Sequence, residues 1–283
     1  MKFGNIIKKI MILGIITTLT VGLVSCGEKV NKDGANTGVN SSESKDSTLD
    51  KDELVIGLDD TFVPMGFKDE SGELVGFDVE LAKAVGEKLN KKIKFQPIDW
   101  SMKETELNNG NIDLIWNGYS INDERKQKVE FSNAYLNNRQ VIITLADSTV
   151  NSKKDLEGKK IGAQNQSSSV DAVEGDGDLI KTFDGGKLVT FETNNDALMD
   201  LESGRLDAIV ADEILARYYM KERGEEKYKV LDEDFGDEQY GVGIKKGDTK
   251  FLEAFNKALS ETVSDGTAGK ISEKWFDKDI IIK

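Results

Sequence analysis

One short run combines an arginine with the local pattern of a helix start. Residues 117–125 read NGYSINDER and follow an apolar stretch typical of a buried strand. A guanidinium presents paired donors that match a planar carboxylate, which a lysine ammonium cannot copy. Asn122 is a good N-cap residue, so a helix opening at Asn122 or Asp123 would carry Arg125 near its start. The run indicates either a carboxylate-binding arginine or a solvated arginine paired with Asp123 or Glu124.

A second polar run, residues 161–169, reads IGAQNQSSS and looks like a strand that enters a serine-rich helix start. The free amides and the macrodipole at such a helix start favour an anion. A nucleophilic serine would need a base, and the chain has no histidine. The run therefore predicts an anion-binding loop or a simple N-cap.

A third candidate is Asp212, which follows the apolar residues 208–211. A ligand that carries an ammonium group needs a partner for that charge once water is removed, and a buried carboxylate supplies one. The competing interpretation is an ordinary helix N-cap.

The elements that would position these residues alternate along the chain. From residue 54 onward, β-rich runs alternate with helical patterns, which predicts an α/β protein with largely parallel sheets. We expect a first strand over residues 54–58, a helix capped by Asp78 with apolar residues every four positions from 81 to 89, and a strand over residues 93–97.

A similar sequence motif occurs in both halves of the chain. Residues 107–115 read LNNGNIDLI and residues 201–209 read LESGRLDAI, each a helix end, a glycine turn and a strand. The similarity indicates two similar lobes or a chance match of common turns. The strands lead to residues 117–120 and to Asp212, and ligands in open α/β sheets gather beyond the carboxyl ends of strands.

Two further strand-like runs flank the second half. Residues 140–145 and 240–246 would be paired crossings between the lobes, so that helices over residues 251–276 complete the first lobe. Such a hinge can close around a ligand.

Composition excludes several classes of protein. The absence of histidine rules out Ser-His-Asp and Cys-His catalysis and histidine zinc sites, and there is no Walker A or GxGxxG motif, so no cofactor is predicted. The net charge of −14 disfavours nucleic acid as a partner. The acidic runs at residues 176–178 and 232–238 lack the spacing of a calcium loop and are interpreted as solvated surface.

The N-terminus has the pattern of an export signal. Lysines 2, 8 and 9 precede an uncharged apolar run over residues 10–24, followed by Cys26, the only cysteine. The string LVSC at residues 23–26 resembles the lipobox of bacterial lipoproteins, which implies cleavage before Cys26 and a lipid on its sulfur; the alternative is an ordinary secreted protein. Removing residues 1–25, with three lysines and no acidic residue, changes the net charge from −14 to −17. Residues 26–52 would be a lipidated, flexible linker.

From residue 53 to 283 the chain resembles the polar-amino-acid substrate-binding proteins of ABC importers, with the type II periplasmic-binding-protein fold. The resemblance implies that Arg125 binds the α-carboxylate of an amino acid together with Ser167 and Ser168. It implies that Asp212 binds the α-ammonium group with the Gly118 carbonyl and the Ser120 hydroxyl. Asn122 replaces the usual threonine, and Gln166 stands where glycine is usual.

The same resemblance places side-chain recognition on the remaining residues. Aromatic rings would come from Phe62, Trp100 and Tyr119, and polar groups from Asp59, Asn117 and Gln164. These polar groups favour a polar ligand side chain, with cystine among the candidates.

The expected protein is an α/β, two-lobed binding protein with two hinge crossings and a ligand cleft between its lobes. Lobe 1 would comprise residues 53–140 and 241–283, and lobe 2 residues 141–240. It would be a monomer on the extracytoplasmic face of a bacterial cell membrane, anchored only by its lipid, and would deliver an amino acid to an ABC permease. The alternatives are a dehydratase-like enzyme that uses Glu213 or Asp59 as an acid, and a surface sensor or adhesin.

Overall fold

The computed structural model describes residues 47–283. The expected signal peptide, Cys26 and the linker up to residue 46 lie outside the described residues. The linker was expected to reach residue 52, but the 3-10 helix η1 (Thr48–Asp50) is part of the folded body. The Ser47 hydroxyl and the Thr48 amide each donate to the Asp248 carboxylate at 2.7 Å, so this segment is held in place.

The first sheet has five strands in the order β5-β1-β6-β13-β7. Strand β1 pairs in parallel with β5 and β6, whereas β13 pairs antiparallel with β6 and β7. Leu54, Ile56 and Leu58 are buried, which explains why this run forms a central strand. The strands are β1 (Glu53–Leu58), β5 (Lys92–Pro97), β6 (Leu114–Ile115), β7 (Glu130–Phe131) and β13 (Gly243–Ile244).

Helices cover this sheet, and two of them, α8 and α9, are the last elements of the chain. They are α1 (Phe77–Leu89), α2 (Lys103–Asn109), α3 (Asp123–Lys128), α8 (Thr249–Ser264) and α9 (Thr267–Phe276), with the 3-10 helix η2 (Trp100–Met102) before α2. The expected apolar period in α1 is confirmed, since Leu81 and Val85 are buried. The expected cap is wrong, because Gly76 occupies the N-cap of α1 and Asp78 lies in its first turn. Asp78 instead accepts hydrogen bonds from the Gly118 amide and the Tyr135 hydroxyl.

A small antiparallel sheet lies between β1 and α1 in the sequence. It consists of β2 (Thr61–Phe62), β3 (Gly66–Lys68) and β4 (Leu74–Val75). Its first strand buries the Phe62 ring, which is 6% exposed.

The second sheet has the order β10-β9-β11-β8-β12. Its parallel part joins β9 to β10 and to β11, and its antiparallel part joins β11 to β8 and β8 to β12. The strands are β8 (Leu136–Leu145), β9 (Ile161–Gln164), β10 (Val189–Phe191), β11 (Ala208–Asp212) and β12 (Tyr228–Tyr240). The helices are α4 (Ser168–Gly175), α5 (Gly177–Ile180), α6 (Asn194–Glu202) and α7 (Glu213–Arg223), with short 3-10 turns η3 (Lys153–Leu156), η4 (Asp184–Gly186) and η5 (Glu225–Lys227).

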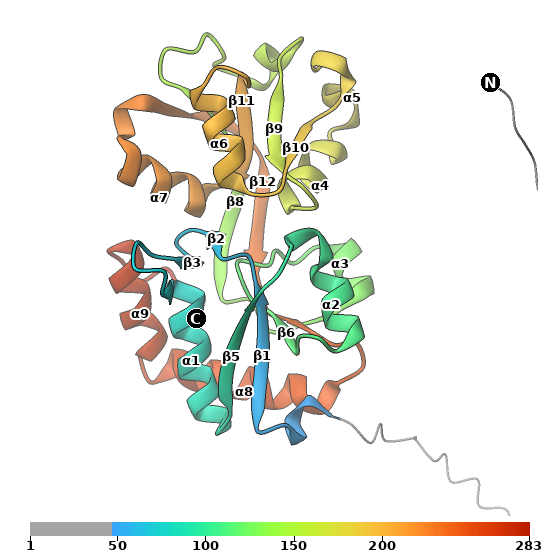
Figure 1. The fold of residues 1–283 in the computed structure, drawn as a ribbon, viewed down its shortest axis with the longest axis vertical. Coiled ribbons are helices and arrows are strands. Elements are labelled where there is room, and N and C mark those ends of the chain that lie inside the picture. The colour runs from blue at the N-terminus through green and yellow to red at the C-terminus, as the bar shows by residue number, and fades with distance from the viewer. Residues whose placement is uncertain (1–46) are drawn as a thin grey trace, which may run out of the picture. The chain divides into compact units, whose positions relative to one another are not determined.

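Two long strands link the two sheets, as the green β8 and the orange β12 show in Figure 1. They pair antiparallel from Leu136 opposite Tyr240 to Leu145 opposite Tyr228. The expected first crossing lies within β8. The second crossing was expected over residues 240–246, but it ends at Tyr240, and the chain then joins the first sheet as β13. In the run 232–238, Asp232, Glu233 and Asp237 are exposed, as the surface interpretation expected. The run is nevertheless part of a hinge strand, and Glu238 is only partly exposed.

The repeated motif, residues 107–115 and 201–209, has the same local structure in both halves. Gly110 and Gly204 have φ angles of 77° and 73°, which is the left-handed region that glycine adopts without steric cost. In each case the helix ends at this turn and the chain continues into a strand, β6 or β11. We use the names lobe 1 and lobe 2 for the residue ranges expected from the sequence, and each of the two five-stranded sheets belongs mainly to one of them.

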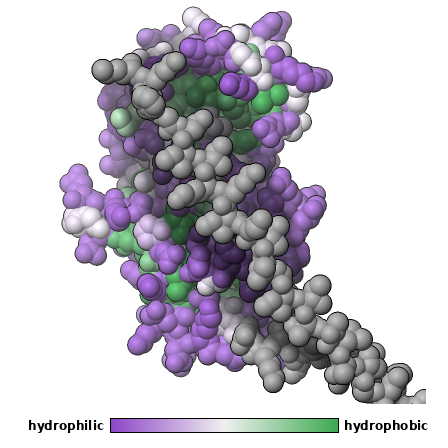
Figure 2. Space-filling view, turned by 45° about the vertical axis from the view of Figure 1, so that its right-hand side comes forward, coloured by the Kyte–Doolittle hydropathy of each residue, from purple (hydrophilic) through white to green (hydrophobic). Residues whose placement is uncertain are grey.

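On the face in Figure 2 the described surface is mostly hydrophilic, and apolar residues show in recessed areas. The large apolar side chains that are exposed within residues 47–283 are Met102, Val189 and Met199. No helix in this range has the length and apolar character needed to cross a membrane.

Candidate functional site

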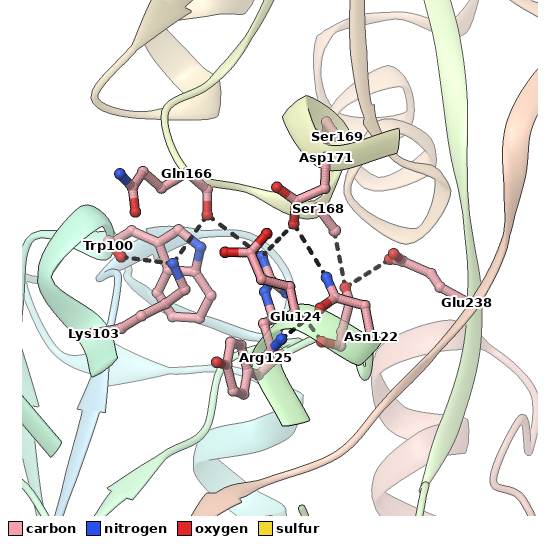
Figure 3. Close-up of polar contacts among 12 residues, drawn as sticks. Trp100, Lys103, Asn122, Glu124, Arg125, Gln166, Ser168, Ser169, Asp171 and Glu238 are labelled. Carbon is pink, nitrogen blue, oxygen red and sulfur yellow. Dashed lines mark hydrogen bonds and ion pairs between the residues drawn. The ribbon is translucent and has the colours of Figure 1, made fainter. Parts of the chain in front are cut away.

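Arg125 lies on α3 and is buried between the two lobes. Asn122 caps the helix by accepting a hydrogen bond from the Arg125 amide at 2.8 Å, as expected. Arg125 as a whole is 3% exposed. Its guanidinium donates from Nη1 to the Ser120 carbonyl at 3.1 Å and from Nη2 to the Gln166 carbonyl at 3.4 Å (Figure 3). Its Cζ lies 4.8 Å from the centre of the Tyr119 ring. Arg125 is therefore a cation held in a largely dry gap.

The alternative of a solvated helix arginine does not describe Arg125. Glu124 pairs with Lys128 at 2.7 Å, and Asp123 pairs with Lys126 at 3.2 Å. The nearest anion to Arg125 is Asp171 of α4, whose Oδ2 lies 3.8 Å from Nη2. That separation and the Asp171 exposure of 38% make this a weak ion pair.

The serine-rich run forms the turn between β9 and α4. Ser167 is the N-cap of α4, but its side chain makes no capping hydrogen bond, and its buried hydroxyl oxygen has no partner. Gln166, where glycine was expected, keeps the left-handed conformation that glycine would favour, with φ of 54°. The Gln166 carbonyl thereby receives the Arg125 guanidinium, so the start of α4 faces Arg125 across the lobes.

Ser120 connects the two lobes and separates a cation from an anion. Its hydroxyl lies 2.9 Å from the Ser168 hydroxyl of lobe 2 and donates to Glu238 Oε1 at 2.8 Å. Its carbonyl accepts from Arg125. A positive and a negative side chain therefore contact the same small residue.

Asp212 and Glu238 form a pair of carboxylates at the hinge strands. Both accept from the Asn138 and Gln140 amides; the Asn138 contacts are 2.6 Å each, and the Gln140 contact to Glu238 is 2.8 Å. Burial, followed by the Glu238 charge, raises the pKa of Asp212 well above its usual range. A cation beside this pair would offset the repulsion between the two carboxylates, so the position suits a cation.

The N-cap interpretation of Asp212 does not hold. Asp212 occupies the N-cap position of α7, but its side chain makes no capping hydrogen bond. The Asn138 oxygen accepts from the Ile214 amide instead, at 3.4 Å.

Asp59 and Gln164 form a second polar contact between the lobes. Asp59 follows β1 and accepts from the Thr61 amide at 2.9 Å and hydroxyl at 2.6 Å. Its other oxygen accepts from Gln164 Nε2 at 2.7 Å. Burial raises the pKa of Asp59, although the hydrogen bonds from Thr61 and Gln164 oppose that shift.

Asn117 and Gly118 form the turn beneath this contact. The Asn117 oxygen accepts from the Asp59 amide at 3.1 Å, while its buried Nδ2 has no partner. Gly118 has φ of 57°, and an added Cβ would lie 2.8 Å from the Phe62 ring. Only glycine fits this position without strain.

The aromatic candidates differ in their surroundings. Phe62 and Trp100 are slightly exposed, at 6% and 7%, whereas Tyr119 is fully buried. Tyr119 stacks on Phe131 at 5.0 Å, donates to Glu104 at 2.9 Å and lies against Arg125. Tyr119 therefore supports the guanidinium from behind.

Sequence reasoning missed Glu238, Asn138, Gln140 and Lys103. The signals were period-two positions: Leu136, Asn138 and Gln140 share the buried face of β8, and Glu238 shares a face with the buried Tyr240. Lys103 lies three residues after Trp100 and four before the buried Leu107, which is core spacing for a helical turn.

Other features of residues 47–283 lie outside this set. No group of three or more acidic, histidine or cysteine side chains suited to a metal ion is found in that range. A cavity of about 650 Å³ lies between α7 and the C-terminal segment, lined by Pro64, Glu213, Tyr218, Trp275 and neighbouring residues, and none of the twelve expected binding residues lines it.

Comparisons with known proteins identify the family of this chain. The family of bacterial extracellular solute-binding proteins, family 3, matches residues 54–278. The L-cystine-binding protein TcyJ of Escherichia coli K12 is 31% identical over 229 residues, which cover 80% of this chain and 84% of that protein. The arginine-binding extracellular protein ArtP of Bacillus subtilis 168 is 30% identical over 269 residues, covering 95% and 98%.

A solved structure shows the same relationship. The substrate-binding protein of an ABC uptake transporter from Streptococcus pneumoniae, with bound histidine, superposes with a TM-score of 0.80 at 41% identity, covering 82% of this chain and 95% of that chain. The family resemblance and the two-lobed α/β fold expected from the sequence are confirmed. The chain belongs to the bacterial extracellular solute-binding proteins of family 3.

Proposed function

We propose that this protein captures a polar amino acid between its lobes and delivers it to an ABC permease. One observation carries the proposal: Ser120 lies between the buried Arg125 guanidinium and the Glu238 carboxylate, next to Asp212. An amino acid carries its carboxylate and its ammonium on one carbon. Paired sites of opposite charge separated by a single residue suit that arrangement.

The carboxylate would lie between Arg125 and the start of α4. A guanidinium can donate two parallel hydrogen bonds to a carboxylate, and each charge-assisted bond contributes about 1.5 to 3 kcal/mol net. The amides at the start of α4, with the Ser167 and Ser168 hydroxyls, would bind the opposite face of the carboxylate. The partnerless Ser167 hydroxyl would gain an acceptor in this way.

The ammonium group would bind Asp212 and Glu238, with the Ser120 hydroxyl and the Gly118 carbonyl as further acceptors. Two carboxylates that share amide donors without a cation repel each other. A ligand ammonium would relieve that repulsion. Because Asp212 and Ser120 belong to different lobes, the ligand would favour the closed state.

The ligand side chain would meet Asp59, Asn117 and Gln164, with Phe62 and Trp100 as apolar walls. Asn117 Nδ2 is a buried donor without a partner, which supports a ligand acceptor at this end. The Asp59 carboxylate accepts from Thr61 and Gln164 and could also face a ligand donor. Relatives are named for cystine and arginine, and a related structure contains bound histidine; all three ligands have polar side chains.

Direct contacts between the lobes occupy the positions that ligand groups would take. Ser120 contacts Ser168, and Asp59 contacts Gln164. We infer that these contacts break when the lobes open and are replaced by ligand contacts on closure.

We propose that the protein binds its ligand without changing it. The dehydratase alternative needs a protonated carboxylic acid, and Glu213 is a poor one. Glu213 pairs with Arg139 at 2.6 Å and Arg217 at 3.0 Å, and the Arg139 hydrogen bond lowers the pKa of Glu213. Asp59 has a raised pKa but is hydrogen-bonded on both oxygens.

The location of the protein is part of the same proposal. Cys26 would carry a lipid that anchors the protein, as a monomer, on the outer face of a bacterial cell membrane, with no other membrane contact and no nucleic-acid partner. Labelling growing cells with a radioactive fatty acid tests the anchor: Cys26→Ser should lose the label that the unaltered protein carries.

A thermal-shift panel of the twenty amino acids and cystine tests the main proposal. A ligand at about 100 times its dissociation constant adds about 2.7 kcal/mol of stability, which is a clear rise in melting temperature. No shift with any member would contradict amino-acid binding. Uptake of the hit by cells with and without the gene then separates transport from a sensor or adhesin role.

A further inference from the structure

Lys103 at the start of α2 is a buried lysine that the proposed ligand contacts do not use. It is 1% exposed, and its Nζ donates to the Trp100 carbonyl of its own lobe at 3.2 Å. The same Nζ donates to the Gln166 carbonyl of lobe 2 at 3.0 Å (Figure 3). Burying a lysine charge is costly, so these acceptors and the Glu104 carboxylate at 3.5 Å must offset that cost.

The backbone carbonyl of Gln166 accepts hydrogen bonds from two cationic side chains. Arg125 Nη2 approaches it at 3.4 Å and Lys103 Nζ at 3.0 Å, from helices α3 and α2 of lobe 1. The left-handed conformation of Gln166 accompanies this arrangement. The turn that leads into α4 is thus held against lobe 1 at its centre.

We propose that Lys103 is a positioning residue that holds residues 164–168 against lobe 1, so that the start of α4 faces Arg125 when the lobes close. Opening the lobes would break the bond to Gln166 and leave the bond to Trp100, so the amine stays prepositioned for the next closure. Burial and the Arg125 charge lower the pKa of Lys103 to about 8. By favouring the closed state, Lys103 would also slow release of the ligand. This effect on ligand release rests on the proposed function, whereas the effect on closure does not.

The closure test uses inter-lobe distances in the protein without ligand. Spin labels on Asn109→Cys and Glu157→Cys, exposed residues of lobes 1 and 2, report the closed fraction when Cys26 is replaced by serine. Lys103→Met keeps an apolar stem without the donor, and should lower the ratio of closed to open protein by about tenfold or more. Lys103→Gln, whose amide nitrogen is one bond short of the amine, should lower that ratio in the same direction and serves if the methionine variant does not fold.

Two variants serve as matched controls. Lys88→Met removes a lysine of lobe 1 that pairs with Asp265 on the surface, and should leave the closed fraction unchanged. Gln166→Gly keeps the backbone carbonyl and should also remain as closed as the unaltered protein. If Gln166→Gly opens as much as Lys103→Met, the contact belongs to the glutamine side chain and the proposal is overturned.

The ligand test follows the dissociation rate of the amino acid found in the panel, read from tryptophan fluorescence because Trp100 adjoins the contact. Lys103→Met should release the ligand about tenfold faster or more, with little change in association rate. A folded Lys103 variant with an unchanged closed fraction and an unchanged dissociation rate overturns the proposal. If no amino acid binds any variant, the proposed function fails while the distance measurement still decides the role of Lys103.

Discussion

The carboxylates of Asp212 and Glu238 accept hydrogen bonds from the same atom, Nε2 of Gln140. Asp212 ends a strand of lobe 2, and Glu238 lies on the hinge strand β12, so the two meet only in the folded chain. Burial and the Glu238 charge together make ionisation of Asp212 unfavourable. A cation that enters this position changes that balance, which makes proton binding and ligand binding interdependent.

Ligand binding should release protons. The pKa of Asp212 is raised in the unliganded protein, and an ammonium beside it should lower that pKa. A lowered pKa means that binding expels a proton, so affinity should fall as the pH falls through the raised pKa. Calorimetry in two buffers with different ionisation enthalpies measures the proton release.

Substitutions of Asp212 and Glu238 test whether the released proton comes from this pair. Asp212→Asn should bind ligand weakly and release no proton, and Glu238→Gln should release fewer protons than the unaltered protein because the repelling charge is gone. A binding heat that is the same in both buffers at every pH would show that the pair does not take up a proton.

Replacing Arg125 with lysine should weaken binding about tenfold to a hundredfold. Lysine keeps the charge but cannot form two parallel bonds to a carboxylate, and the loss of one such bond corresponds to about 1.5 to 3 kcal/mol. Titration calorimetry gives the affinity. Lys126→Ala, an exposed cation on the same helix, is the control and should bind as the unaltered protein does. Equal affinity in Arg125→Lys would remove the guanidinium from ligand recognition.

Stability should depend on the protonation of Asp78. Its side chain is 2% exposed, Oδ2 accepts from the Gly118 amide at 2.7 Å and the Tyr135 hydroxyl at 3.0 Å, and burial raises its pKa to about 7. The folded protein therefore holds this proton more tightly than the unfolded chain, whose pKa is about 3.9. The stabilisation due to the proton is complete below about pH 4 and is lost as the pH rises to about 7.

Asp78→Asn tests this stabilisation because the amide does not titrate. Between pH 5.5 and 8, the free energy of unfolding of the variant should rise by about 2 kcal/mol relative to the unaltered protein, measured with urea. A difference between the two proteins that does not change with pH would show that Asp78 titrates normally.

The sequence predicted best what is fixed by local chemistry. Asn122 caps α3 because its short side chain reaches the Arg125 amide within one turn. Gly110 and Gly204 end their helices because both positions need a left-handed residue. The position of Arg125 after a strand and a cap could therefore be predicted, and so could the family.

Prediction failed where contacts distant in the sequence override local preference. Asp78 has the chemistry of a cap, but the Gly118 amide and the Tyr135 hydroxyl draw it inward. Residues 232–238 have little preference for strand structure, yet pairing with β8 carries them into β12, with register shifts between Val230 and Asp237. Glu238 was therefore placed on the surface.

Lys103 shows a further limit of sequence reasoning. A lysine at a core position of a helical turn is normally assigned to solvent, because burying its charge is costly. The acceptors that make burial tolerable are the carbonyls of Trp100 and Gln166, and Gln166 comes from a different lobe. No pattern in residues 100–107 could indicate that partner.

The hydrogen bonds from Ser47 and Thr48 to Asp248 fasten the start of the folded body to the beginning of α8. A force applied to the chain before Ser47 would therefore act on α8, and it would not act directly on the hinge strands β8 and β12. If the protein is attached through its N-terminal side, lobe 1, which contains α8, would stay fixed relative to the attachment, and lobe 2 would move when the hinge bends.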